Sequence, residues 1–223
     1  MYLWIKLRSG LQKTMKILIV DDHAVILQGL KRILEDEFRG TTFGEAHHFQ
    51  EAIDLLRQER WNIVILDIDL PGRSGLDVLR QIKTERLSSS VIVFSMYPED
   101  QFAVRALKAG ASGYVAKNSA SEQLVEAIRK VSGGGKYVSA TLAERLAADL
   151  GQERLRVPHE MLSDREFEVM RLMAAGKGIT AIAELLSLSV KTVSTYRTRI
   201  LEKLQFETTS QLIRYAIEHG LDR

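Results

Sequence analysis

The sequence contains no cysteine among its 223 residues. That absence excludes disulfide bonds, thiolate metal sites and cysteine nucleophiles, and it fits a protein of the reducing cytoplasm. No apolar run approaches the roughly 20 residues that a transmembrane helix needs, so we expect no membrane partner. Residues 1–14 carry three basic residues but no long apolar stretch and no cleavage-like site. We therefore interpret them as an N-terminal extension before Met15 and not as a signal peptide.

An excess of one charge is also lacking, because the formal net charge is only +2. The distribution of charge says more than its sum. Residues 15–137 hold 16 basic and 17 acidic residues, whereas residues 191–203 hold four basic residues and one acidic residue. The positive charge is concentrated on one short segment, as expected where a protein meets a polyanion.

Short apolar runs alternate with amphipathic segments between residues 15 and 132. The runs predict strands, and the segments predict helices with apolar residues spaced by three and four. The strands are almost continuously apolar, as burial on both faces requires. This order predicts an α/β doubly wound, five-stranded parallel sheet of the flavodoxin-like kind. The predicted strands are residues 16–20, 41–46, 62–67, 90–95 and 112–117. The first predicted helix has its apolar positions at Val25, Ile26, Leu30, Ile33 and Leu34. The other predicted helices are residues 51–59, 74–83, 99–109 and 121–132.

The pattern changes after three consecutive glycines at 133–135, which cannot continue a helix cheaply. Residues 133–160 are predicted to be a linker with one short helix at 140–149. Residues 161–223 contain only helical patterns, the first opened by a capping box of Ser163 and Glu166. Further helices are predicted at 180–186, 190–204 and 208–218. We expect a small all-α helix-turn-helix domain.

Polar residues follow four of the predicted strands, where open parallel sheets bind their ligands. The first strand ends at Asp21 and Asp22 and the third at Asp67, whereas Ser95 and Lys117 end the fourth and fifth. Clustered carboxylates repel one another and need a cation, and oxygen ligands with open positions suit Mg²⁺. The cluster predicts a site that moves a phosphoryl group onto a carboxylate.

Residues 15–132 resemble the receiver domains of two-component response regulators. The match consists of the aspartate pair after the first strand, D-x-D-x-P-G at 67–72, a serine after the fourth strand and Y-x-x-K at 114–117. The resemblance implies that Asp67 accepts phosphate from a sensor histidine kinase. It also implies a Mg²⁺ site made by Asp21, Asp22, Asp67 and the backbone carbonyl of Asp69.

The same resemblance assigns a phosphoryl contact and a switch. Lys117 is expected to contact the phosphoryl group. Ser95 and Tyr114 are expected to switch, the hydroxyl moving toward the phosphate and the ring following inward. The side chain of Asp69 is expected to lie beside the pocket and to tune the lifetime of the phosphate.

Residues 188–204 predict a DNA-reading helix. Val193, Ile200 and Leu204 define its inward stripe, and small hydroxylated residues fall on the opposite face. A helix that enters the major groove needs such close approach to bases, together with positive charge for phosphates.

The stretch from Leu162 to Leu204 resembles the LuxR-type output domain in its L-S-x-R-E-x-E-V opening, its I-A-x-x-L core and its K-T-V-x-x-Y recognition helix. The resemblance implies sequence-selective binding to promoter DNA. Arg197 stands where relatives often have an apolar residue, so its stem is expected to pack inward. The expected DNA contacts are Lys191, Thr192, Ser194, Thr195, Thr198, Arg199 and Lys203.

The charge balance of the output region favours a dimer on DNA. Residues 161–223 hold nine basic and eight acidic residues, a net of +1, so a single copy should bind DNA weakly. We expect a homodimer when the protein is phosphorylated, on paired half-sites. Leu212, Tyr215 and Ala216 are candidates for the dimer face or for the core. We hypothesise that phosphorylation releases or dimerises this unit through residues 133–160.

Two alternatives to a phosphorylated, non-enzymatic regulator remain. A receiver-like module can regulate by protein contact alone, without phosphotransfer. Haloacid-dehalogenase-type phosphatases also use a strand that ends in D-x-D, but there Thr or Val follows, where this chain has Leu70 and Pro71. Their remaining acidic pair comes later in the chain, whereas Asp21 and Asp22 come earlier.

Overall fold

The structure is a computed structural model that describes residues 14–119, 121–150 and 157–222. Nearly all of the predicted N-terminal extension, and residues 151–156 of the predicted linker, lie outside these ranges. Within them, no helix is long and apolar enough to cross a membrane.

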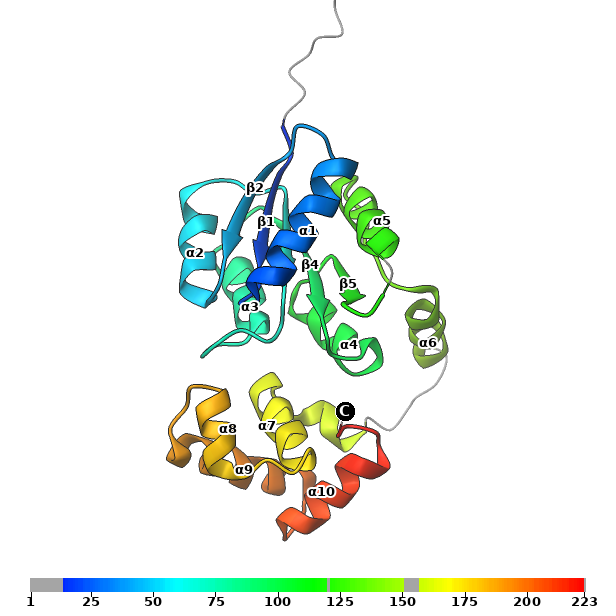
Figure 1. The fold of residues 1–223 in the computed structure, drawn as a ribbon. Helices are drawn as coiled ribbons and strands as arrows, with labels where there is room; N and C mark the ends of the chain where they lie inside the picture. The colour runs from blue at the N-terminus through cyan, green and yellow to red at the C-terminus, as the bar shows by residue number, and fades with distance from the viewer. Residues whose placement is uncertain (1–13, 120, 151–156, 223) are drawn as a thin grey trace, which may run out of the picture.

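Five parallel strands form one sheet, in the order β2-β1-β3-β4-β5 (Figure 1). The prediction of a doubly wound α/β fold is confirmed. The order reverses direction beside β1, so the carboxyl ends of β1 and β3 border the crevice where such sheets bind ligands. The strands are β1 (Lys16–Val20), β2 (Thr42–Ala46), β3 (Ile63–Leu66), β4 (Ser90–Ser95) and β5 (Gly113–Ala116).

Successive residues of a strand point into two different cores because the side-chain period is two. Leu18 and Val20 of β1 belong to the core that α2, α3 and α4 cover, whereas Ile17 and Ile19 belong to the core that α1 and α5 cover. The helices are α1 (Ala24–Glu37), α2 (Phe49–Gln58), α3 (Gly75–Thr84), α4 (Glu99–Ala109) and α5 (Ser121–Ser132).

The apolar stripe predicted for the first helix is partly wrong. Leu27, Leu30 and Leu34 make the buried face of α1, while Val25 is 83% exposed and Ile33 is 38% exposed. Two residues along an α-helix are about 200° apart, so Val25 lies on the side of α1 opposite the buried Leu27.

The segment after the glycines packs on the receiver edge. The Tyr137 N–H donates to the Ser112 carbonyl oxygen at 2.9 Å, and Tyr137 forms an isolated parallel bridge with Gly113 of β5. The Ser139 hydroxyl donates to the Glu99 carboxylate at 2.6 Å. The helix α6 (Ala140–Leu150) follows, close to the predicted residues 140–149.

Residues 157–222 form the helical output domain. Capping boxes open α7 through Ser163 and Glu166, and α10 through Thr208 and Gln211. Leu212 and Ala216 are fully buried, so they belong to the core of this domain and not to a dimer face. The elements are the 3₁₀ helix η1 (Pro158–Met161), α7 (Asp164–Ala174), α8 (Ile179–Leu185), α9 (Val190–Leu204) and α10 (Thr209–Glu218).

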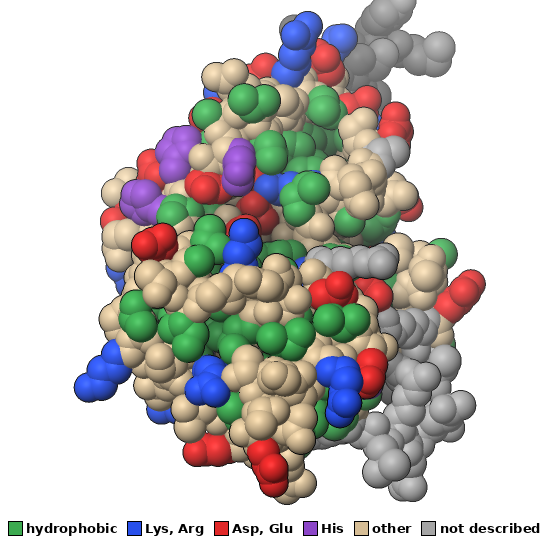
Figure 2. Space-filling model, turned by 60° about the horizontal axis from the view of Figure 1, so that its bottom comes forward, with side chains coloured by type: hydrophobic (Ala, Val, Ile, Leu, Met, Phe, Trp, Pro, Cys, Tyr) green, Lys and Arg blue, Asp and Glu red, His purple; other side chains and the backbone are tan. Residues whose placement is uncertain are grey.

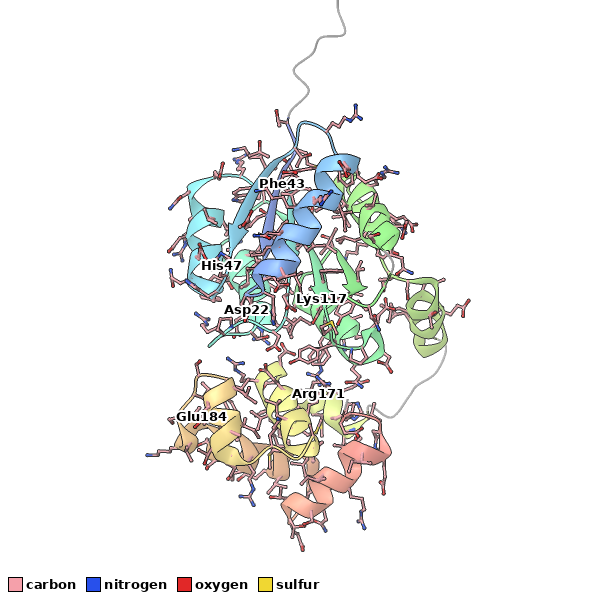
Figure 3. The ribbon with its side chains drawn as sticks, in the orientation of Figure 1. Asp22, Phe43, His47, Lys117, Arg171 and Glu184 are labelled. Atoms are coloured by element: carbon pink, nitrogen blue, oxygen red, sulfur yellow. The ribbon has the colours of Figure 1, made fainter. Side chains whose placement is uncertain are left out.

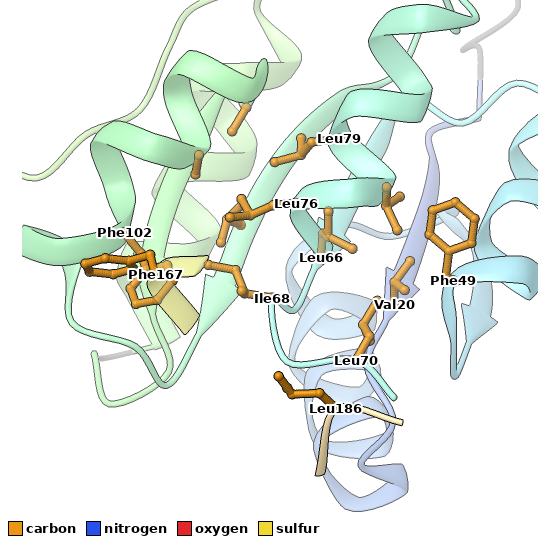
Figure 4. Packing of buried hydrophobic residues seen from close by; sticks show 14 of the residues in the cluster. Val20, Phe49, Leu66, Ile68, Leu70, Leu76, Leu79, Phe102, Phe167 and Leu186 are labelled. Atoms are coloured by element: carbon orange, nitrogen blue, oxygen red, sulfur yellow. The ribbon is translucent and has the colours of Figure 1, made fainter. Parts of the chain in front are cut away.

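The output domain lies against the carboxyl edge of the sheet (Figure 1). Buried residues of both domains belong to one hydrophobic cluster, in which Phe102 of α4 meets Phe167 of α7 edge to face at 5.3 Å (Figure 4). Leu70 and Leu186 contribute to the same cluster from the β3–α3 loop and the end of α8. Figure 2 shows the two domains in contact at the surface, with histidine and acidic side chains gathered beside that boundary. This closed arrangement puts the output domain next to the predicted phosphorylation site.

Candidate functional site

Lys117 joins two of the predicted carboxylates at the carboxyl edge of the sheet. Its ammonium nitrogen lies 2.5 Å from Asp21 Oδ2 and 2.5 Å from Asp67 Oδ2. The three side chains are only 3–4% exposed. The strand ends that the sequence placed together are therefore in contact, although 96 residues separate Asp21 from Lys117.

Burial and the ion pairs act in opposite directions on this cluster. Burial raises the pKa of Asp67, and the neighbouring Lys117 ammonium opposes that shift. Burial lowers the pKa of Lys117, but Asp67 and Asp21 outweigh it, so the pKa is raised overall. Lys117 is thus held as a cation, and it neutralises part of the charge on Asp67.

Four residues offer ligand atoms within 4.8 Å of one another: Asp21, Asp22, His23 and Asp67. The three carboxylates are hard oxygen donors that fit a divalent cation such as Mg²⁺. The His23 Nδ1 lies 2.7 Å from Asp22 Oδ1, and this carboxylate raises the pKa of His23. Sequence reasoning missed His23, because nothing in the strand-end pattern distinguishes it from an ordinary residue before a helix. Asp22 and Lys117 lie in the half of the receiver that is nearer the output domain (Figure 3).

Asp69 lies just outside the buried cluster. Its backbone N–H donates to Asp67 Oδ1 at 3.3 Å. Burial raises the pKa of its carboxyl group, and Asp22 adds to the effect. The charge of Asp22 thus acts on the Asp69 carboxyl group, and the proposed effect of Asp69 on the lifetime of the phosphate stays a prediction.

The two predicted switch residues are linked through Tyr97. The Tyr97 N–H donates to the Ser95 hydroxyl at 3.3 Å, and the Tyr114 hydroxyl donates to the Tyr97 carbonyl oxygen at 2.7 Å. Tyr114 is 1% exposed, and its burial raises the pKa of its hydroxyl. In this structure the Tyr114 ring lies inside and its hydroxyl is bonded to the β4–α4 loop, and the expected inward movement on phosphorylation stays a prediction.

A glycine allows the next helix to approach the proposed phospho-acceptor closely. A Cβ atom on Gly75 would lie 1.9 Å from the Asp67 carbonyl oxygen. Ser74 caps α3 by accepting from the Leu76 N–H, and its hydroxyl donates to the Ile68 carbonyl. These contacts fix the backbone that carries Asp67.

The output domain presents three charged residues of α7 to this edge, and sequence reasoning missed them all. Arg165 donates to the Gly72 carbonyl in the β3–α3 loop and lies 2.6 Å from Glu168. Burial raises the pKa of Glu168 and lowers that of Arg171. The sequence gives no signal of this, because charged residues on a helix normally indicate solvent. Figure 3 shows Arg171 at the boundary between the domains.

Two arginines of the receiver complete the contact. Arg80 and Arg105 both pair with Asp164 at the start of α7. Arg105 also donates to the carbonyl oxygens of His159 and Leu162 at 2.6 and 2.8 Å. The closed arrangement thus rests on ion pairs as well as on apolar contact.

The predicted DNA face of α9 is open to solvent. Val193 and Ile200 are fully buried and Leu204 is 6% exposed, as predicted, whereas Thr195 and Thr198 are exposed. Ser194 and Thr192 are half-buried. A hollow of about 280 Å³ lies on the first turns of the helix, lined by Ser189, Lys191, Thr192, Thr195, Tyr196 and Arg199.

Two basic residues of α9 already have partners. The Lys203 ammonium lies 2.6 Å from Glu166 of the α7 capping box. The Arg197 Nε donates to the Thr209 hydroxyl at 2.7 Å, and the residue is half-buried. Lys191 and Arg199 are exposed. This difference affects DNA binding, because a basic side chain that is already neutralised by an acidic partner adds less to phosphate binding.

Both parts of the chain match known families. Residues 17–129 match the model described as the response regulator receiver domain. Residues 160–216 match the model described as bacterial regulatory proteins, luxR family. The boundaries of these matches lie within the two folded parts.

Relatives of known name match nearly the whole chain. Response regulator UvrY of Escherichia coli is 34% identical over 206 residues, which cover 92% of this chain and 94% of UvrY. Response regulator GacA of Pseudomonas aeruginosa is 34% identical over 207 residues, which cover 92% and 97% of the two chains.

Solved structures of the Salmonella response regulator RcsB match as well. One superimposes with a TM-score of 0.68 at 28% identity and covers 91% of this chain and 96% of RcsB. Another, bound to the rprA promoter in the presence of phosphomimetic BeF₃⁻, has a TM-score of 0.64 at 28% identity and covers 91% and 98%.

We expect Asp22→Asn to weaken Mg²⁺ binding by roughly tenfold or more, because it removes one of three clustered carboxylate charges. Isothermal titration calorimetry of the full chain measures this. Asp36→Asn, on the exposed side of α1, is the matched control and should bind Mg²⁺ like the wild type. An unchanged affinity in Asp22→Asn would show that the cation is held elsewhere.

Proposed function

The chain belongs to the two-component response regulators that join a receiver domain to a LuxR-type output domain, and on that premise we propose that phosphorylation of Asp67 controls its binding to promoter DNA. The observation that carries the proposal is the buried contact of Lys117 with Asp21 and Asp67. It provides a carboxylate nucleophile with a fixed positive charge beside it.

The proposed reaction is transfer of a phosphoryl group from a phosphohistidine of a sensor kinase. An Asp67 carboxylate oxygen forms a bond to phosphorus while the bond from phosphorus to the histidine nitrogen breaks. Lys117 lies where it can pair with the new phosphoryl oxygens. A Mg²⁺ ion held by Asp21, Asp22 and Asp67, with the Asp69 carbonyl as the further proposed ligand, would supply additional charge neutralisation. The Ser95 hydroxyl would donate a hydrogen bond to a phosphoryl oxygen.

The alternatives are weaker. Residues 17–129 match a receiver model, so we set the haloacid-dehalogenase interpretation aside. A module that works without phosphotransfer has no need for a buried Lys117 between two carboxylates. The three groups are in contact here, which favours an active pocket.

The proposed DNA surface is the exposed face of α9. Lys191, Thr192 and Arg199 line the hollow at its start and are placed to meet phosphates, while Ser194, Thr195 and Thr198 are proposed to reach base edges. Lys203 is proposed to meet a phosphate only if its ion pair with Glu166 is shared or opened. RcsB has been solved as two dimers bound to two parallel DNAs, and we propose that this protein likewise acts as a homodimer on promoter DNA, in the cytoplasm.

We expect Asp67→Asn to abolish phosphorylation by acetyl phosphate with Mg²⁺, because the amide is not a nucleophile. Phosphate-affinity gel electrophoresis of the full chain measures this. Asp69→Asn is the matched control from the same loop: it should still incorporate phosphate, with a changed rate of loss. Normal incorporation in Asp67→Asn would place the acceptor on another residue.

We expect Arg199→Ala to lower the slope of log affinity against log salt for duplex DNA by about 1, because one exposed phosphate contact is lost. Lys203→Ala should lower it less, since Glu166 already neutralises this ammonium. Fluorescence anisotropy with a labelled duplex at several salt concentrations compares the two. Equal slopes for both variants and the wild type would move the DNA contact away from this face of α9.

A further inference from the structure

Tyr97 connects the pocket to the output domain through the loop that follows β4. It lies two residues after Ser95, in the loop between β4 and α4. Its backbone N–H is bonded to the Ser95 hydroxyl, and its carbonyl oxygen accepts from the Tyr114 hydroxyl. Both proposed switch side chains therefore hold the backbone of this one residue.

The ring of Tyr97 faces the other way, into the boundary between the domains. It stacks on Phe102 at 4.4 Å with an interplanar angle of 13°. The Arg171 guanidinium of α7 lies 4.5 Å from the Tyr97 ring centroid and 5.2 Å from that of Phe102. In return, Arg105 of the receiver lies 4.1 Å from the ring of Phe167 in α7. Each domain thus places an arginine on an aromatic ring of the other.

One hydrogen-bond donor of the buried Arg171 side chain lacks a partner. Arg171 is 8% exposed, and its Nε has no hydrogen-bond partner. Among the described residues, the other buried side-chain atom without a partner is Gln101 Oε1, and the amide nitrogen of Gln101 donates to Gly220 of the output domain. A buried donor that lacks a partner regains hydrogen bonds when it meets water. The contact is therefore suited to opening.

We propose that Tyr97 is the positioning residue that transmits the state of the Asp67 pocket to the output domain, through its stack with Arg171. The proposal rests on the proposed phosphorylation of Asp67. When the Ser95 hydroxyl moves to a phosphoryl oxygen, the long 3.3 Å bond from the Tyr97 N–H is lost. The loop shifts, the ring moves from under Arg171, and α7 separates from the receiver.

Geometry, and not charge alone, carries this coupling. Lys117, together with the Mg²⁺ that the carboxylates would hold, would neutralise added phosphoryl charge inside the pocket. A guanidinium stacks flat on a ring, whereas a lysine ammonium keeps the charge without that planar contact. Arg171→Lys therefore distinguishes coupling through the planar stack on Tyr97 from coupling through the positive charge alone.

Hydrogen exchange of the α7 amides in the full chain tests the proposal, with and without Mg²⁺ and fluoroberyllate as the phosphoryl probe. In the wild type, fluoroberyllate should speed exchange. In Tyr97→Leu and Arg171→Lys, exchange should already be about tenfold faster without the probe, with little further gain. Tyr97→Phe keeps the ring and should behave as wild type, because the ring makes the contacts with Phe102 and Arg171.

Arg80→Gln is the control for a merely weakened interface. It removes an ion pair with Asp164 outside the proposed route, so it should raise the basal exchange and keep the response to fluoroberyllate. A Tyr97→Leu protein that keeps the full response overturns the proposal, and so does an Arg171→Lys protein that matches the wild type. Fluorine NMR reports the bound probe independently: a wild type that binds none overturns the proposed function itself.

Discussion

The receiver fold and its proposed chemistry both depend on the ion pairs of Lys117, whose ammonium lies between two carboxylates buried at the edge of the sheet. The carboxyl ends of β1 and β3 bring Asp21 and Asp67 together, and without the ammonium these charges would be left unpaired away from water. Removing one partner of such a buried pair costs about 3–5 kcal/mol. A phosphoryl group at the proposed acceptor Asp67 would redistribute the same contacts, since Lys117 would then pair with a group of greater negative charge. Folding and the proposed signalling therefore depend on the same two ion pairs of Lys117.

The edge that holds this ion pair is also the edge that holds the output domain. Arg165 reaches the β3–α3 loop, and Arg171 covers the β4–α4 loop, so α7 touches two of the loops that leave the pocket. Any change in those loops alters the contact between domains. By linkage, if phosphorylation weakens the closed arrangement, closure must disfavour the phosphorylated form by the same factor. The proposed DNA face of α9 is exposed, so the control that we propose would come from how the domain is held and not from burial of that face.

The sequence predicted what depends on local pattern and strand order. Asp67 and Lys117 were found because each ends a strand, and parallel strands bring their ends to one edge. Tyr97, Arg165 and Arg171 were not found, because their roles depend on how two folded domains meet, and hydropathy describes each helix only against solvent. Val25 was assigned to the apolar stripe of α1 because its hydropathy alone does not distinguish a buried side chain from an exposed one. Leu212 and Ala216 could be assigned to core or interface only after the four output helices were placed.

The distance between the domains tests most directly the claim that phosphorylation opens the molecule. The chain has no cysteine, so cysteines placed at the exposed positions Glu126 of α5 and Glu184 of α8 would carry the only two spin labels. Pulsed electron–electron double resonance should give one narrow distance distribution in the unphosphorylated protein. With Mg²⁺ and fluoroberyllate the distribution should broaden and move to other distances. The same narrow distribution in both states would contradict the account.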